Sequence, residues 1–150
     1  MKEPIALASD HNGFKMKNEI KNYLLEKGYQ VDDFGVDDET PMNYPEIAIK
    51  VCRQVQAGKY GRAILVCGTG AGMAIVANKI KGVRAVCIHD AYTAERARAS
   101  NDAQVATLGS YVIGISNAKK NLDIWLESEF AGGGSLPKVE MIKALDQKEV

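Results

Sequence analysis

Short apolar runs alternate with longer segments of mixed polarity along the 150-residue chain. Each run is too short for a helix, and most are rich in β-branched residues, so they predict five β-strands. The runs are Ile5–Ser9, 29–34, 63–67, 83–88 and 105–108. The second run is polar enough to lie at a sheet edge. The others are typical of strands buried on both faces.

The segments between the runs repeat apolar residues at helical spacing, which predicts helices with one buried face. The apolar residues are Phe14, Ile20 and Leu24; Ile47, Ala48, Val51, Cys52 and Val55; an Ala/Ile/Val stretch after Gly72; the Ala-rich stretch 91–99; Ala118, Leu122, Trp125 and Leu126; and Val139, Ile142 and Leu145 within 136–147. Gly28 and Gly58 end two of these helices, and Asp90 caps a third. Prolines and acidic residues predict a loop over 35–45, and three glycines predict a flexible break over 131–134.

This β-α-β-α order predicts a single α/β domain over residues 1–150: a three-layer α/β/α, Rossmann-like fold with a five-stranded parallel sheet and a C-terminal helix. In such a sheet the ligand lies beyond the carboxyl ends of the strands, where the strand order reverses. The residues that follow the strands are therefore the candidates for a site. They are Ser9-Asp10-His11, Cys67-Gly68-Thr69-Gly70, His89-Asp90 and Gly109-Ser110.

The most informative stretch is 61–79, GRAILVCGTGAGMAIVANK, in which a thiol and three alternating glycines follow a strand. Gly68, Gly70 and Gly72 let the backbone approach a ligand, and the N–H groups at the start of a helix point at it. Alone, this is a weak signal. The loop follows the third strand, and Met73 occupies the place of the last glycine of a dinucleotide fingerprint. Cys67 is either a packing thiol or a reactive one stabilised by these N–H groups.

The other cysteines and the overall composition narrow the function classes. Cys52 on a helix stripe and Cys87 inside a strand are interpreted as buried packing thiols. Lys plus Arg and Asp plus Glu both total 19, so no charge excess indicates a nucleic-acid or membrane partner. Three cysteines, no membrane span and no signal peptide indicate a cytoplasmic protein without disulfides.

Six short motifs follow one another along the chain: Ser9-Asp10-His11-Asn12-Gly13, Asn43-Tyr44-Pro45, Cys67-Gly68-Thr69-Gly70-Ala71-Gly72, Ala77-Asn78-Lys79, Gly82-Val83-Arg84-Ala85 and Ser100-Asn101-Asp102-Ala103. In these motifs and their order, the chain resembles the ribose-5-phosphate isomerase B and galactose-6-phosphate isomerase (RpiB/LacAB) family. The resemblance covers essentially the whole chain. It implies a homodimer or homotetramer in which the neighbouring subunit completes each active site, with no cofactor and no metal.

The resemblance also implies the catalytic roles. Aldose–ketose isomerisation through a cis-enediolate needs one base that removes a proton and returns it, and Cys67 matches that base in the family's cysteine branch. Thr69 beside it would support the thiolate. The family's other branch uses a glutamate base just past the loop, and Met73 stands at that position here, so Cys67 is the only candidate for the base. Backbone N–H groups over 68–72 would stabilise the enediolate oxygen, as in an oxyanion hole. Asn101 would add a side-chain donor to the same oxygen.

Further matched positions would bind the substrate, a small phosphorylated sugar. Asp10 and Tyr44 would hold sugar hydroxyls, and His11 would lie near the ring or the phosphate. Ser100 stands where members that open a furanose ring carry histidine, and serine is no acid/base near neutral pH. Lys138 matches one phosphate-binding arginine, with a charge but without the bidentate fork.

These departures leave alternatives for the function. Tyr111 and Gly134 also replace arginines of the family pattern, so the phosphate is held differently. The block 89–96 with Ser100-Asn101 is similar to that of D-erythrulose-4-phosphate isomerases, whose tetrose substrate needs no furanose opening. Ribose 5-phosphate ⇌ ribulose 5-phosphate is the family default. A non-catalytic sugar-phosphate-binding subunit and a generic nucleotide-binding module are the readings outside this enzyme class.

Overall fold

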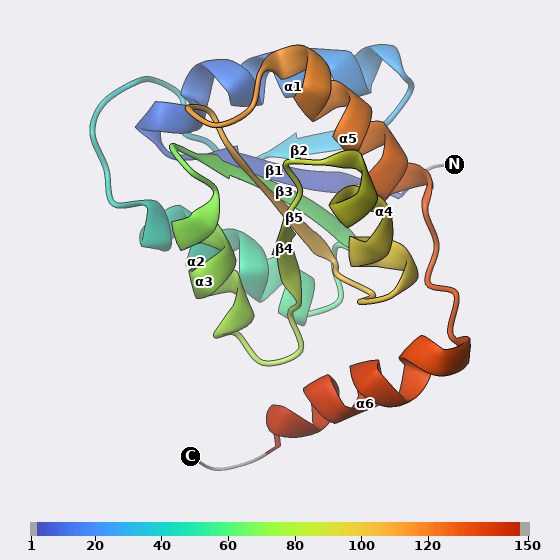
Figure 1. The fold of residues 1–150 in the computed structure, drawn as a ribbon. Coiled ribbons are helices and arrows are strands. Elements are labelled where there is room, and N and C mark those ends of the chain that lie inside the picture. The colour runs from blue at the N-terminus through green and yellow to red at the C-terminus, as the bar shows by residue number, and fades with distance from the viewer. Residues whose placement is uncertain (1–2, 148–150) are drawn as a thin grey trace.

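The computed structural model describes residues 3–147 as one α/β domain. A five-stranded parallel sheet lies between two layers of helices (Figure 1), which confirms the fold class expected from the sequence. The predicted extent of the domain, 1–150, includes residues 1–2 and 148–150, which lie outside the described residues.

The sheet has the strand order β2-β1-β3-β5-β4. The strands are β1 Ile5–Ser9, β2 Val31–Asp33, β3 Arg62–Cys67, β4 Ala85–Cys87 and β5 Val105–Gly109. The edge position predicted for the second strand is confirmed. The fourth strand was expected to be buried, but it is three residues long, partly exposed, and lies at the other edge. An apolar run indicates that a strand is buried on its faces, but does not reveal whether it has a neighbour on both sides.

Residues 3–147 also form six α-helices and two 3₁₀ turns, which connect the strands or follow the last one. They are η1 His11–Gly13, α1 Phe14–Glu26, α2 Tyr44–Gln56, α3 Ala71–Asn78, α4 Ala91–Ala99, α5 Ile115–Glu127, η2 Gly133–Ser135 and α6 Leu136–Leu145. Asp90 caps α4 as predicted, because its carboxylate accepts the Thr93 N–H. The expected loop 35–45 is shorter than predicted, since α2 already begins at Tyr44. Pro45 starts that helix rather than preventing it, because a first-turn N–H has no helical partner to lose.

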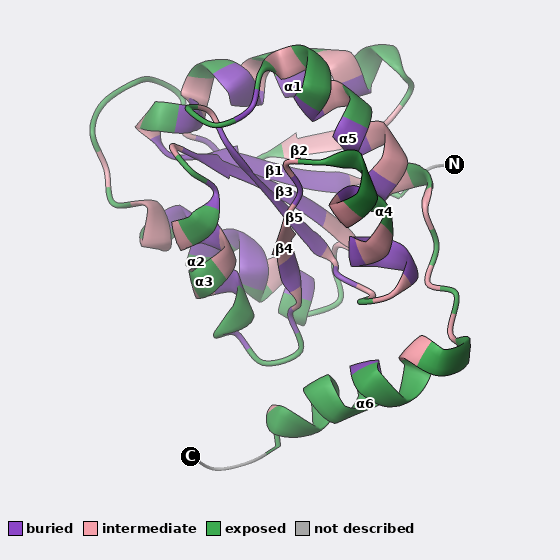
Figure 2. Ribbon diagram, viewed as in Figure 1, coloured by how far each residue is buried: buried purple, intermediate pink, exposed green. Residues whose placement is uncertain are grey.

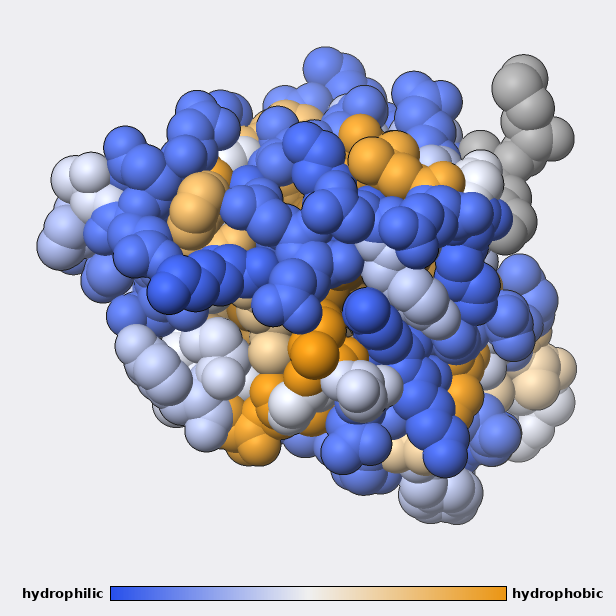
Figure 3. All heavy atoms as spheres, turned by 90° about the horizontal axis from the view of Figure 1, so that it is seen from above, coloured by the Kyte–Doolittle hydropathy of each residue, from blue (hydrophilic) through white to orange (hydrophobic). Residues whose placement is uncertain are grey.

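Both faces of the sheet are covered, so β1, β3 and β5 are buried along almost their whole length (Figure 2). Helices α1, α4 and α5 pack on one face around Ile64, Leu108 and Trp125. Helices α2 and α3 pack on the other face, against Leu65 and Cys67. The face of the molecule shown in Figure 3 is mostly hydrophilic, with apolar atoms in smaller patches. Successive strand residues point to opposite faces, which is why the runs are continuously apolar.

Helix α6 differs from the sequence expectation. Val139 is buried, but Ile142 and Leu145, expected on the same packed side, are exposed. Figure 1 shows α6 standing apart from the sheet, and Figure 2 shows it as mostly exposed. A hydrogen bond joins the end of α6 to the rest of the domain, where Asp146 Oδ2 accepts the Gly82 N–H at 2.8 Å. Helical periodicity predicts an apolar face but not the surface that covers it.

Candidate active site

The Cys67 thiol lies at the carboxyl end of β3, beside the β1–β3 boundary where the strand order reverses. Its side chain is buried, and its Sγ accepts the Gly70 N–H at 3.1 Å. An N–H donor directed at sulfur stabilises negative charge there, and the start of α3 adds its dipole. The Cys67 sulfur therefore faces an N–H donor and the start of a helix.

The glycines after Cys67 permit close packing. Gly70 has φ +77°, a left-handed conformation that favours glycine, and an added Cβ would come within 2.9 Å of Cys87 Sγ. At Gly72 an added Cβ would overlap the ring and hydroxyl of Tyr44. The structure thus places Tyr44 directly over the first turn of α3. The Thr69 hydroxyl accepts the Ala71 N–H at 3.3 Å, which stabilises the turn.

Asp10 and His11 follow β1, and parallel pairing of β1 with β3 puts them beside the Cys67 loop. Asp10 is buried and its Oδ1 accepts the Gly13 N–H at 3.0 Å, so it caps the η1 turn. His11 Nδ1 accepts the Met42 N–H at 3.1 Å. This bond leaves Nε2 as the protonated ring nitrogen, and it ties the 35–43 loop to the site.

Tyr111 closes one side of the same region. Its ring lies over Gly68, where an added Cβ would be 3.0 Å from Cδ2, and its hydroxyl donates to Asn12 Oδ1 at 3.0 Å. Beside the Tyr111 ring lies a cavity of about 330 Å³, which is lined by His11, Asn12, Lys15, Glu39 and Tyr111. Lys15 brings a cation next to His11, with its Nζ 3.6 Å from Glu39.

Cys87 and His89 form the outer edge of the site. Cys87 was interpreted as a buried packing thiol, but it is only half-buried, with Sγ 3.6 Å from the His89 ring nitrogens and 3.8 Å from the Thr69 carbonyl. The correction follows from the edge position of β4. Burial raises the pKa of the Cys87 thiol and lowers the pKa of the His89 imidazole. His89 Nε2 accepts the Gly109 N–H at 2.8 Å.

Cys52, in contrast, behaves as a packing thiol. It is fully buried within the α2 stripe, and burial raises its pKa to about 12. A thiol with that pKa stays protonated near neutral pH, so its role is to fill space. Of the three cysteines, only Cys67 combines a strand-end position with an N–H donor on its sulfur.

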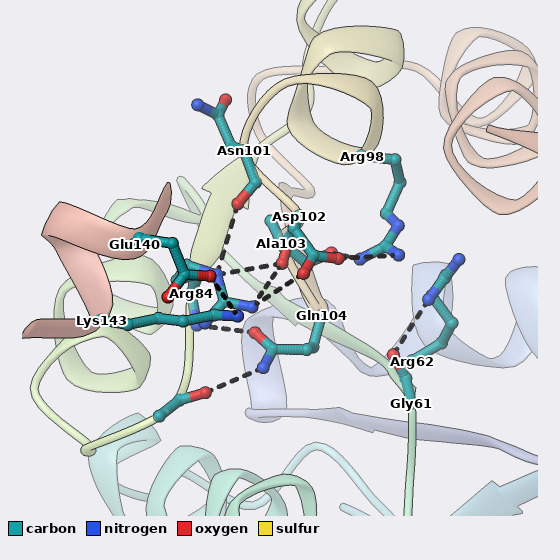
Figure 4. A network of polar contacts seen from close by, with 11 residues as sticks. Gly61, Arg62, Arg84, Arg98, Asn101, Asp102, Ala103, Gln104, Glu140 and Lys143 are labelled. Carbon is teal, nitrogen blue, oxygen red and sulfur yellow. Dashed lines mark hydrogen bonds and ion pairs between the residues drawn. The ribbon is translucent and has the colours of Figure 1, made fainter. Parts of the chain in front are cut away.

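Three of the expected site residues lie elsewhere in the chain's own fold. Ser100 and Asn101 precede β5, whereas the Cys67 loop follows β3, so the length of a strand separates them. Five strand residues span about 17 Å. Asn101 instead belongs to a network at the amino edge of the sheet, which is the side where the strands begin (Figure 4). Lys138 is exposed on α6. One copy of the chain therefore brings together Asp10, His11, Tyr44, Cys67 and the glycines, but not these three.

Lys15 and Asn12 are site residues that the sequence reading did not assign. Both follow β1, so the strand-end rule could have included Asn12. Lys15 lies four residues after His11, a spacing that puts two side chains on one face of a helical segment. That spacing was the available signal.

Among residues 3–147, no group of three or more His, Cys, Asp or Glu side chains is arranged to hold a metal ion. Within the same range, no helix is both long and apolar enough to cross a membrane.

Comparison with known proteins places this arrangement in a family. The family model described as "Ribose/Galactose Isomerase" matches residues 5–142. A Listeria innocua protein named "Ribose-5-P isomerase B" is 49% identical over 96% of this chain and 97% of its own length. A Pectobacterium atrosepticum "D-erythrulose-4-phosphate isomerase" is 48% identical over 97% and 96%. The solved structure of Clostridium thermocellum ribose-5-phosphate isomerase B superimposes with a TM-score of 0.94 at 38% identity, covering 96% of this chain and 97% of that one. This protein belongs to the ribose/galactose isomerase family and is an aldose–ketose isomerase.

Proposed function

We propose that this isomerase acts on a phosphorylated sugar through a cis-enediolate, with Cys67 as the base. One observation carries the proposal: at the sheet's switch point, a buried thiol accepts the Gly70 N–H at the start of a helix. The family membership supplies the reaction class. Asp10, His11 and Tyr44 surround the thiol and offer polar groups to sugar hydroxyls.

The proton transfer is internally balanced. The Cys67 thiolate removes the proton from the carbon beside the substrate carbonyl, and the freed electron pair forms the carbon–carbon double bond of the enediolate. The carbonyl oxygen takes the negative charge. The thiol then returns this proton to the former carbonyl carbon, while the proton of the neighbouring hydroxyl passes to the former carbonyl oxygen. That oxygen becomes a hydroxyl, the other oxygen becomes the new carbonyl, and the thiolate is restored.

Backbone N–H groups are the proposed stabilisers of that oxygen. Of the first-turn donors of α3, Gly70 N–H serves the sulfur and Ala71 N–H serves Thr69. The N–H groups of Gly72 and Met73 are the remaining ones, and they are proposed to face the enediolate oxygen. One such donor typically contributes about 2.7–4 kcal/mol to the transition state.

We further propose that a second copy of the chain completes each site. Asn101, Ser100 and Lys138 lie far from Cys67 within one copy, so they can reach a substrate only in another copy's site. In a closed dimer, each active site would combine the Cys67 loop of one copy with Ser100, Asn101 and Lys138 of the other copy. We also propose that the protein forms a homodimer or a homotetramer and that it is located in the cytoplasm. His11 and Lys15 would meet the phosphate from one side, and Lys138 of the second copy would meet it from the other.

Ribose 5-phosphate is the default substrate, and a tetrose 4-phosphate is the second candidate. Tyr111 favours the second candidate, because its ring covers Gly68 and its hydroxyl is bonded to Asn12, in the place expected for a phosphate-binding arginine. Ser100 accepts a hydrogen bond from Arg96 at 3.1 Å and offers no ring-opening imidazole. The 48% identical relative is named for D-erythrulose 4-phosphate.

The test is a comparison of kcat/KM on ribose 5-phosphate, allose 6-phosphate, galactose 6-phosphate and D-erythrulose 4-phosphate. We expect turnover of at least one of them, with D-erythrulose 4-phosphate ahead if Tyr111 and Ser100 set the preference. A preference for ribose 5-phosphate would reject the tetrose alternative. No turnover of any phosphosugar, together with binding of one of them, would favour the non-catalytic subunit instead.

A further inference from the structure

The turn that carries Asn101 has an unusual backbone. Among residues 3–147, Asp102 is the one non-glycine residue with a clearly positive φ, +48°. L-residues rarely adopt this left-handed conformation, although Asp tolerates it better than most. Such a conformation persists where the surroundings enforce it. The contacts of Asp102 therefore show what holds the backbone in this conformation.

Arg84 and Arg98 hold Asp102 in this left-handed conformation. The Asp102 carboxylate bridges them, with Oδ2 3.3 Å from Arg84 Nη2 and Oδ1 3.1 Å from Arg98 Nη2. The side chains of Arg84 and Arg98 are 12% and 7% exposed, so both pairs are shielded from water. Figure 4 shows the two guanidinium groups on either side of the turn.

The same arginines hold the main chain of the turn. Arg84 Nε donates to the Asn101 carbonyl at 3.3 Å and to the Asp102 carbonyl at 3.0 Å. Arg98 Nη1 donates to the Ala103 carbonyl at 2.8 Å. Three successive carbonyls are thus bound by guanidinium donors, which are strong because they are charged.

Arg84 is itself fixed to the sheet. It directly precedes β4, and its N–H donates to Gln104 Oε1 at 2.8 Å, while Gln104 Nε2 donates to the Gly82 carbonyl at 2.8 Å. The turn is therefore linked to the starts of two neighbouring strands, β4 and β5.

The Asn101 side chain is the group that this arrangement presents to solvent. The residue is exposed, and Figure 4 shows its amide directed away from the arginines. The amide makes none of the hydrogen bonds recorded for residues 3–147, whereas the Asn101 carbonyl is bound. A fixed backbone thus holds an unused donor and acceptor outward, at the edge opposite Cys67.

We propose that Arg84 and Asp102 are positioning residues, which set the place of the Asn101 amide against the enediolate oxygen in a second copy's site. The inference rests on the proposed function. Neither residue touches the substrate. Their effect reaches the reaction through Asn101, since a shift of about 1 Å in a positioned group can lower the rate about 10²-fold.

A purely structural role for Arg84 would lower stability and rate whether or not Asn101 is present. The two roles are separated by a cycle of four enzymes: wild type, Arg84→Met, Asn101→Ala and the double variant, each assayed on the best substrate of the panel above. We expect Arg84→Met to lower kcat by about 10- to 100-fold with KM changed less than about 3-fold. In the Asn101→Ala background, the same change should lower kcat by less than about 2-fold.

Arg53→Met is the matched control. Arg53 lies exposed on α2 and bonds only to Gln56 of its own helix among the contacts recorded for residues 3–147. It should keep wild-type kcat. Equal effects of Arg84→Met in both backgrounds, or no effect in either, would overturn the inference.

Two further measurements cover failures of folding and of the proposed function. If Arg84→Met does not fold, Asp102→Asn and Asp102→Gly take its place. Asn keeps a side-chain acceptor for the arginines. Gly can adopt the same positive φ, but it removes the carboxylate that the arginines bind. We expect Asn to retain kcat and Gly to lose it; the same kcat in both would overturn the inference. If the wild type turns over no phosphosugar, the proposed function fails on its own. Hydrogen exchange of peptide 100–104 then decides whether Arg84 and Asp102 hold the turn, and unchanged exchange in the variants would reject it.

Discussion

The carboxyl edge of the sheet, where the strands end, and the amino edge, where they begin, carry different chemical groups. At the carboxyl edge, glycines and free N–H groups surround Cys67, and two aromatic rings lie directly over Gly68 and Gly72. At the amino edge, guanidinium groups bind the carbonyls of a left-handed turn at Asp102. The first edge offers donors to a ligand. The second uses its donors internally and offers one amide.

The difference supports the proposal that a single copy contains two half-sites rather than one site. N–H groups and a thiol suit the reacting atoms, because they stabilise negative charge where it develops. A held side chain suits an interaction across an interface, because the ordering cost is met when the chain folds. The proposed site joins the two edges between copies. The following predictions test that pairing, beginning with the largest effect.

Complementation should show the largest effect. Cys67→Ser removes the base from one edge and should lower turnover by about 10²–10⁴-fold. Asn101→Ala removes the donor from the other edge and should cost about 10²–10³-fold. After subunit exchange, an equal mixture should recover about a quarter of wild-type turnover, because half of the symmetric dimers are mixed and each mixed dimer has one intact site.

Two controls make the complementation specific. Mixing Cys67→Ser with the Cys67→Ser/Asn101→Ala double variant should recover nothing. Cys52→Ala should keep wild-type turnover, because Cys52 is a packing thiol. If native mass spectrometry shows mixed dimers without recovered turnover, the two edges do not share a site.

The glycines of the carboxyl edge give the next effect. Gly70 and Gly58 have the same φ, +77°, but an added Cβ meets Cys87 Sγ and the Leu108 backbone at 2.9 Å only at Gly70. Alanine at either position pays about 1–2 kcal/mol for the left-handed backbone. At Gly70 the overlap should add about 1–3 kcal/mol. Urea unfolding of Gly58→Ala and Gly70→Ala measures both.

Turnover should separate these two variants further. Gly58→Ala should keep wild-type kcat, since Gly58 lies at the end of α2, away from the thiol. Gly70→Ala should lower kcat, because the N–H that supports Cys67 moves with residue 70. Equal losses of stability in the two variants would show that close packing at this edge is not what requires glycine.

A change of pH should have the smallest effect, and only at the carboxyl edge. Burial, opposed by Asp90, lowers the pKa of His89 below its ordinary 6.5, so the folded state favours the neutral ring that accepts the Gly109 N–H. At lower pH the unfolded chain binds more protons, so this stability is complete above pH 6.5 and is lost as pH falls through the folded pKa. Between pH 8 and pH 5, the Tm of wild type should fall more than that of His89→Gln, by about 2 °C or less. The reverse order would contradict the assignment of a neutral His89.

Much of the fold could be predicted from the sequence because both faces of the sheet are covered. Continuous apolar runs such as 63–67 then identify strands, and stripes such as Ile47 to Val55 identify helices, without knowledge of their neighbours. Boundaries were less certain. Tyr44 and Pro45 belong to a helix that starts inside the predicted loop, since a proline at a helix start is permitted by its missing N–H.

The site could be predicted only in part. Strand-end position correctly grouped Asp10, His11 and Cys67, because parallel strands end at one edge. The resemblance placed Asn101 in the same site, although a residue just before β5 lies at the other edge of its own copy. Cys87 was misjudged because its exposure depends on β4 having a neighbour on one side only.

Sequence alone determined the chemistry available around the loop 61–79: a thiol at a strand end, glycines that let other groups approach, and N–H groups at a helix start. These are local properties of residue type and order. The tertiary structure decided which side chains use that space. Tyr44, Tyr111 and Cys87 reach the glycines from three different parts of the chain, and Arg84 reaches Asp102 from the position just before β4. Such contacts depend on how the elements pack, and chain order alone does not set them.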